Sequence, residues 1–222
     1  MKPRKISMLT AYDYPFAKIL DEAGVDIILV GDSLGNVVLG YKDTRSVTMD
    51  DMVHHTKAVA RGVERALVVA DIPYRSVSVR NAKLLIKAGA KAVKVEGIKG
   101  VKRIVKAGIP VMGHLGYLPQ TMRKPKIKRS ASVIKQAKEL EAAGVFAIVL
   151  EMVDPKIAKE VTKTVNAPTI GIGSGRDCDG QVLVTYDILG LTDWAPSFAK
   201  RNVDLKKAAG SAIREFIKDL RP

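Results

Sequence analysis

The chain has 222 residues, 47% of which are apolar, and it carries a formal net charge of +14. No apolar run is long enough to span a bilayer, no signal peptide is recognisable, and one cysteine excludes a disulfide within the chain, so we expect a cytoplasmic protein with no membrane partner. The positive residues are spread over helical segments, and their one dense run, residues 123–129, has no aromatic residue to stack on a base, which argues against a nucleic-acid partner.

The predicted elements alternate between strands and helices along the chain. A strand over residues 5–10 precedes a helix over residues 14–23 that Asp13 caps, and Thr48 with Asp51 marks the start of a helix that ends near Gly62. Further strands are expected over residues 27–30, 67–71, 92–96, 111–114, 147–151, 169–172 and 181–184. Further helices are expected over residues 80–88, 130–143, 155–165 and 205–220.

An Ala-Gly pair joins a helical segment to the following apolar run at Ala23-Gly24, Ala88-Gly89, Ala107-Gly108 and Ala143-Gly144. Glycine after a helix end adopts the left-handed conformation that stops the helix at low cost, so each pair is interpreted as a helix-to-strand turn. Chains that alternate strand and helix in this way form parallel sheets. Eight strands predict a single α/β domain over residues 1–222, a (β/α)8 TIM barrel, with an open doubly wound sheet as the alternative.

Side chains that can carry a proton or bind a metal follow five of the predicted strands. They are Asp32 with Ser33, Asp71, Glu96, His114 and Glu151. All strands of a parallel barrel end at one face, so we expect these groups to converge there. Lys94 and Glu96 are two residues apart and therefore point to the same side of their strand, toward the barrel interior; a structural ion pair between them is the alternative.

Carboxylates at successive strand ends indicate metal chemistry. An oxygen-rich set with no nearby cysteine suits a hard divalent ion such as Mg2+. A 2-oxo acid binds such an ion through its carboxylate and ketone oxygens, and the ion then stabilises the enolate that forms when the proton next to the ketone is lost. Glu151 is left over as the base, and Lys94 is placed to neutralise the developing negative charge.

Several short segments carry a resemblance to a known family. They are residues 30–35 (VGDSLG), 71–73 (DIP), 94–97 (KVEG), 113–120 (GHLGYLPQ), 149–151 (VLE), 170–175 (IGIGSG) and 178–181 (CDGQ). In this order, from about Met8 to Asp204, they resemble the ketopantoate hydroxymethyltransferases. The resemblance implies an enzyme with a barrel of the phosphoenolpyruvate/pyruvate type that assembles as a homodecamer.

The resemblance also implies a reaction and a set of residue roles. The enzyme would transfer a hydroxymethyl group from 5,10-methylenetetrahydrofolate, or an archaeal-type pterin equivalent, to 3-methyl-2-oxobutanoate, giving 2-dehydropantoate in pantothenate and coenzyme A biosynthesis. By this match Mg2+ would be held by Asp32, Asp71 and Glu96, and Glu151 would be the proton acceptor. The substrate-binding residues would be Asp32, Ser33, Asp71, Lys94 and His114, the last a pocket histidine whose role stays open.

The chain departs from the family pattern in the loop after Gln120. A glycine-rich loop is expected there, and Arg123-Lys124-Pro125-Lys126 stands instead; Arg75 likewise occupies a place where glycine is expected. The metal and base positions are unaffected, whereas the contacts to the pterin are expected to differ from the family pattern. The basic loop could suit the anionic tail of an archaeal-type pterin donor.

Two other functions stay open on the residues alone. A related barrel lyase or mutase that acts on 2-oxo acids with Mg2+ would use the same carboxylates. A basic protein without catalysis would instead bind nucleic acid through its lysines and arginines. Magnesium-dependent exchange of the C3 hydrogen of 3-methyl-2-oxobutanoate would distinguish the transferase from both.

Overall fold

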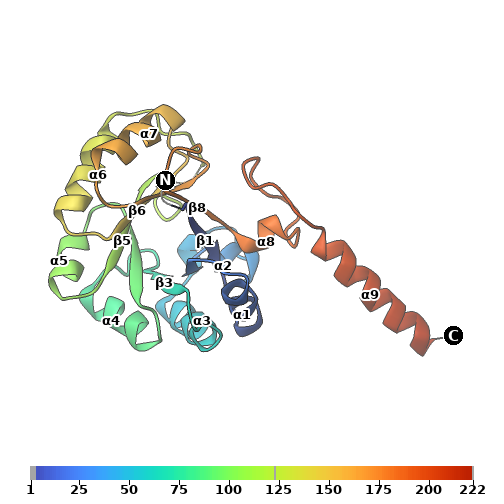
Figure 1. Cartoon of the computed structure of the whole chain (residues 1–222). Helices are drawn as coiled ribbons and strands as arrows, with labels where there is room; N and C mark the ends of the chain where they lie inside the picture. Colours follow the sequence, from blue (N-terminus) through green and yellow to red (C-terminus); the bar gives the residue numbers. More distant parts are fainter. Residues whose placement is uncertain (1–3, 123, 222) are drawn as a thin grey trace. The chain divides into compact units, whose positions relative to one another are not determined.

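The structure, a computed structural model, describes residues 4–122 and 124–221. Eight parallel strands close into a barrel in which each strand pairs with its neighbours in sequence (Figure 1). This arrangement confirms the predicted (β/α)8 barrel and excludes the open doubly wound sheet. The strands are β1 (Ile6–Thr10), β2 (Ile27–Val30), β3 (Leu67–Asp71), β4 (Ala92–Glu96), β5 (Val111–Gly116), β6 (Ala147–Glu151), β7 (Thr169–Ile172) and β8 (Gly180–Leu183).

The helices that connect the strands lie outside the barrel (Figure 1). They are α1 (Tyr14–Glu22), α2 (Leu34–Val37), the 3-10 helix η1 (Thr44–Ser46), α3 (Met49–Arg61), α4 (Val79–Lys87), α5 (Val101–Lys106), α6 (Ser132–Ala142) and α7 (Pro155–Thr164). The predicted start of α3 is confirmed, since Thr48 Oγ1 accepts the Asp51 N–H at 3.2 Å and the Asp51 carboxylate accepts the Thr48 N–H at 2.9 Å. This reciprocal pair satisfies two N–H groups that the first turn leaves without helical partners.

The four Ala-Gly pairs end helices as predicted. The alanines are the C-terminal caps of α1, α4, α5 and α6. The glycines have positive φ angles of 85° at Gly24, 115° at Gly89, 79° at Gly108 and 90° at Gly144. A left-handed residue reverses the chain direction within one position, so each strand begins directly after the helix that precedes it.

Alternate strand residues fill the barrel interior. One buried apolar cluster there contains Met8, Ile27, Leu29, Val69, Ala92, Met112, Ala147, Val149, Ile170 and Val182. In β4, Val93 and Val95 are fully buried but lie outside this cluster, so they belong to the opposite face of the strand, which packs against the helices. Ala92, Lys94 and Glu96 therefore share the interior face, which agrees with the prediction for Lys94 and Glu96.

Residues 183–222 form a second compact unit that contains α8 (Thr185–Ile188) and α9 (Leu205–Leu220). The predicted helix over residues 205–220 is confirmed, and Asp204 caps it by accepting the Lys207 N–H at 2.9 Å. Within α9 no described residue is buried. No helix in the described part of the chain is long and apolar enough to cross a membrane. A single domain over residues 1–222 remains a prediction.

Candidate active site

A polar layer follows the apolar cluster at the carboxyl ends of the strands. Val69, Ala92, Met112 and Val149 belong to the interior cluster, and two residues after each of them, on the same face of the strand, comes a polar side chain. These side chains are Asp71 on β3, Lys94 on β4, His114 on β5 and Glu151 on β6. The strand register sets Asp71 opposite Lys94 and Glu96 opposite His114. Asp32 and Ser33 follow β2 after one intervening residue, Gly31. The structure therefore brings all the predicted site residues to one face of the barrel, while their roles remain predictions.

Asp71 contacts both of its neighbours in this layer. Its Oδ1 lies 2.8 Å from Lys94 Nζ, and its Oδ2 accepts the backbone N–H of Asp32 at 3.0 Å. Asp71, Lys94 and Asp32 are buried. A buried charge is stable only when it is paired, and among the described residues the ion-pair partner of Lys94 is Asp71 rather than Glu96.

Gln120 connects the carboxylates of β2 and β4. Its Nε2 donates to Asp32 Oδ2 at 2.7 Å and to the Ile72 carbonyl at 3.0 Å, and its backbone N–H donates to Glu96 Oε2 at 3.2 Å. The side chain is only 4% exposed. Sequence reasoning assigned it no role, because its contacts depend on the path of the loop after β5. Its place in the GHLGYLPQ segment was the available signal.

His114 lies between Lys94 and two glutamates. Its Nδ1 is 3.4 Å from Lys94 Nζ and 3.8 Å from Glu96 Oε1. Its Nε2 is 3.2 Å from Glu151 Oε2, although these atoms are not aligned as a hydrogen bond. Burial and the charge of Lys94 lower the pKa of His114 well below its usual value, so the ring is neutral at pH 7. A ring that accepts from Lys94 at Nδ1 carries its proton on Nε2, which faces Glu151.

The electrostatics of the site favour binding of a proton or a cation by its carboxylates. Burial, together with the negative charge of Asp71, raises the pKa of Asp32 to about 7. Burial also raises the pKa of Glu96 to about 9 and that of Glu151 to about 7, and in both cases Lys94 opposes the increase. Burial alone would lower the pKa of Lys94, but the charges of Asp71 and Asp32 outweigh it and raise the pKa. One ammonium thus faces several acidic groups.

The backbone of Glu151 is fixed by both neighbouring strands. Its carbonyl accepts the Tyr117 N–H at 2.7 Å, directly after β5. Gly116 has a φ of 101°, and a Cβ at this position would lie 2.1 Å from the Glu151 carbonyl oxygen. After β7, Ser174 Oγ donates to the Leu150 carbonyl at 2.7 Å. These contacts hold the Glu151 side chain at the rim of the barrel.

The donor set fits a hard divalent cation in its chemistry. Asp32, Asp71 and Glu96 offer carboxylate oxygens from the ends of three consecutive strands, and a cation would offset the burial and the carboxylate repulsion that together raise the pKa of Asp32 and Glu96. As they stand, no three His, Cys, Asp or Glu side chains among the described residues are grouped closely enough to hold a metal ion. Each oxygen of Asp71 already has one partner, Lys94 or Asp32, so a metal ion would bind through the lone pairs that remain.

These features define a class of protein, a parallel (β/α)8 barrel with an acidic site at the carboxyl ends of its strands. Phosphoenolpyruvate phosphomutase from Streptomyces platensis subsp. rosaceus has a TM-score of 0.72 with 14% sequence identity, covering 99% of this chain and 85% of that one. A 2,3-dimethylmalate lyase of the PEP mutase/isocitrate lyase superfamily has a TM-score of 0.68 with 15% identity, covering 99% and 83%. A phosphonopyruvate hydrolase solved with oxalate and Mg2+ has a TM-score of 0.67 with 15% identity, covering 98% and 82%.

Comparison with proteins of similar sequence identifies the family. The family model for ketopantoate hydroxymethyltransferase matches residues 1–222. The 3-methyl-2-oxobutanoate hydroxymethyltransferase of Acetivibrio thermocellus is 53% identical, covering 98% of this chain and 84% of the relative. The enzyme of the same name from Ignicoccus hospitalis is 52% identical, covering 98% and 89%. The chain therefore belongs to the ketopantoate hydroxymethyltransferase family, as its motifs predicted, and this is a family of enzymes.

Proposed function

We propose that the chain transfers a hydroxymethyl group to 3-methyl-2-oxobutanoate at the carboxyl-terminal face of its barrel. The donor would be 5,10-methylenetetrahydrofolate or an archaeal-type pterin equivalent. The product would be 2-dehydropantoate, for pantothenate and coenzyme A biosynthesis. The observation that carries the proposal is the position of Glu151, a buried carboxylate with a pKa of about 7, in the same layer as Lys94 and the acidic residues of β3 and β4.

Glu151 would accept the proton from C3 of the oxo acid. A carboxylate with a pKa near 7 is ionised in a large fraction of molecules at neutral pH, and it is a stronger base than an ordinary glutamate, so it is suited to accept this proton. The Nε2–H of His114, 3.2 Å from Glu151 Oε2, would orient the carboxylate once a side-chain rotation aligns the two groups as a hydrogen bond. Lys94 would neutralise the negative charge on the ketone oxygen as the proton leaves. Both carbon–nitrogen bonds that hold the methylene carbon in the donor would break, C3 would bond to that carbon, and water would supply its hydroxyl oxygen. The C3 proton and one proton of the water would end on the two donor nitrogens.

Mg2+ would be held by Asp32, Asp71 and Glu96, and when bound it would supply Lewis-acid polarisation of the oxo acid. The phosphonopyruvate hydrolase of the same fold, solved with oxalate and Mg2+, supports this choice of ion. Gln120 would position the carboxylates through its bonds to Asp32 and Glu96. The oxo acid would contact Asp32, Ser33, Asp71, Lys94 and His114.

Two measurements test the proposal. The first is formation of 2-dehydropantoate from 3-methyl-2-oxobutanoate and 5,10-methylenetetrahydrofolate. The second is loss of deuterium from C3 of the oxo acid into water, which should require Mg2+ and Glu151. Exchange with pyruvate-like acids alone would assign the chain to the related lyases or mutases. Binding to duplex DNA at physiological salt, without turnover, would instead favour a nucleic-acid-binding protein.

A homodecameric assembly and a cytoplasmic location remain predictions. The first comes from the family resemblance and the second from the composition and the single cysteine. Sedimentation of the purified protein measures the first, and fractionation of the host cell measures the second.

A further inference from the structure

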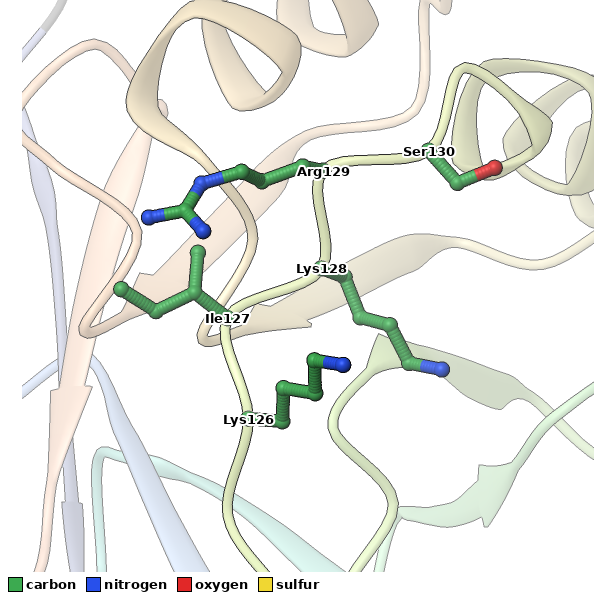
Figure 2. Close-up of a pocket in the computed structure, with 5 residues that line it drawn as sticks. All are labelled: Lys126, Ile127, Lys128, Arg129 and Ser130. Atoms are coloured by element: carbon green, nitrogen blue, oxygen red, sulfur yellow. The ribbon is translucent and has the colours of Figure 1, made fainter.

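A basic pocket lies in the loop between β5 and α6, apart from the carboxylate layer. Its volume is about 380 Å³, and it is lined by Lys126, Ile127, Lys128, Arg129 and Ser130. In Figure 2 the ammonium ends of Lys126 and Lys128 extend to one side of the loop, and Ile127 and Arg129 extend to the other. Three of the five lining side chains are cationic and none is acidic.

The positive charges of this pocket are largely uncompensated. Arg129 Nε lies 3.9 Å from Asp154 Oδ2, and the Arg129 side chain is 74% exposed, which makes that ion pair weak. In the part of the chain that the structure describes, Lys126 and Lys128 have no carboxylate within ion-pairing distance. The two ammonium groups on one side of the loop, with the guanidinium of Arg129 on the other, concentrate positive potential at this loop and attract anionic ligands.

The backbone of Lys128 ties the pocket to the reaction face. The Lys128 N–H donates to the Met152 carbonyl at 2.7 Å, and the Lys128 carbonyl accepts the Asp154 N–H at 2.9 Å, which makes a parallel bridge. Met152 directly follows Glu151 in the chain. The pocket is therefore fixed beside the segment that directly follows β6.

We propose that the basic pocket binds the anionic tail of the one-carbon donor while the pterin ring lies at the barrel face. This inference rests on the proposed function, which supplies the donor. The tail would be a chain of carboxylate or phosphate groups that pairs with Lys126 and Lys128, and the planar guanidinium of Arg129 suits either group. Ile127 would contact the methylene groups between the charges.

The test compares kcat/KM for 5,10-methylenetetrahydrofolate carrying one glutamate with that for the form carrying five. We expect the wild type to prefer the pentaglutamate by about tenfold at low salt, since each exposed charge pair contributes a factor of about 1.5 to 5. The double variant Lys126→Gln/Lys128→Gln should reduce this ratio to about two. The preference of the wild type should also decrease as salt is added.

The matched control is the double variant Lys102→Gln/Lys106→Gln, which removes the same charge from exposed positions of α5. It should keep the wild-type ratio. Thermal unfolding of both double variants verifies that they are folded. An equal decrease in the ratio for both pairs would attribute the preference to net charge and overturn the assignment to the pocket.

Competition distinguishes the two sources of negative charge. If inorganic tripolyphosphate inhibits the wild type but not the Lys126→Gln/Lys128→Gln variant, a tail with phosphates is supported. If a pentaglutamate peptide inhibits in this way instead, a tail with carboxylates is supported. If the wild type turns over both donors equally well and neither anion inhibits it, the proposed role of the pocket is overturned and the proposed function is kept. No turnover and no C3 exchange in the wild type overturns both. Duplex DNA binding that the double variant loses, without a tail effect, would assign the pocket to nucleic acid.

Discussion

The Nε2 atom of His114 on β5 lies 3.2 Å from Oε2 of Glu151 on the neighbouring strand β6. Because burial and Lys94 keep the imidazole neutral, His114 places an uncharged ring nitrogen beside the glutamate instead of a positive charge, and the two atoms are not aligned as a hydrogen bond. The pKa of Glu151 is therefore set by burial, which raises it, and by Lys94, which lowers it. This balance leaves a carboxylate that gains and loses a proton near neutral pH.

Replacing Glu151 with glutamine should abolish catalysis while the fold is kept. An amide cannot accept the C3 proton, and loss of a general base typically costs about 10² to 10⁴ in rate. Turnover and C3 deuterium exchange measure the effect, and thermal unfolding verifies the fold. The control is Glu139→Gln at an exposed position of α6, which should be fully active. A Glu151→Gln variant with more than about a tenth of wild-type exchange would contradict the assigned role.

The rate of exchange should rise with pH through about 7, the pKa of Glu151. Only the ionised carboxylate accepts a proton, so kcat/KM should increase about tenfold per pH unit below this value and become level above about pH 8. Lys94→Met should move the midpoint to higher pH, because Lys94 stabilises the ionised form. Exchange rates across pH 5.5 to 9 measure both profiles. A flat wild-type profile, or a shift to lower pH in the variant, would be inconsistent with this account.

Gln120→Leu should weaken Mg2+ binding by about 10- to 100-fold, the usual effect of losing a residue that orients metal ligands. The leucine removes the bond to Asp32, and the Asp32 carboxylate is then free to rotate. Calorimetric titration of Mg2+ in the presence of the oxo acid measures the affinity. Gln136→Leu on α6 serves as the control and should bind Mg2+ normally. Equal affinity in the two variants would show that Gln120 does not position the carboxylates.

Gly116→Ala should destabilise the protein more than Gly108→Ala. Both glycines have positive φ, 101° and 79°, so alanine should cost each about 1 to 2 kcal/mol in backbone conformation. A Cβ at residue 108 meets no atom within 4 Å, whereas at residue 116 it would lie 2.1 Å from the Glu151 carbonyl oxygen. Urea unfolding should show a further loss of about 1 to 3 kcal/mol for Gly116→Ala, with reduced activity. Equal losses would mean that the contact relaxes without cost.

The fold was predictable because its signals are local. Apolar runs of strand length, helical periodicity and the Ala-Gly pairs each depend on a few adjacent residues, and the parallel barrel follows from their alternation. The same alternation placed Lys94 and Glu96 on one face. The division at residue 183 has no comparable signal, since no linker composition marks it.

The site was predictable only in part. Position at a strand end identified the acidic residues, but the pairing of Lys94 with Asp71 depends on the register between β3 and β4, which local patterns do not encode. Gln120 was missed for the same reason. Arg75, found where glycine was expected, has a φ of 57°, so the arginine adopts the left-handed conformation that glycine would take more easily.

Met152 has a φ of 48°, an unusual value for a residue with a side chain. Its N–H donates to the Ile172 carbonyl at 2.8 Å, and its carbonyl accepts the Lys128 N–H at 2.7 Å. The backbone position of Lys128 is thus set by residues that the ribosome adds after it. During synthesis Lys128 therefore gains this backbone partner only after Met152 has been added, and Met152 is itself held by β7, so we expect this part of the chain to become ordered only once β6 and β7 have emerged and paired.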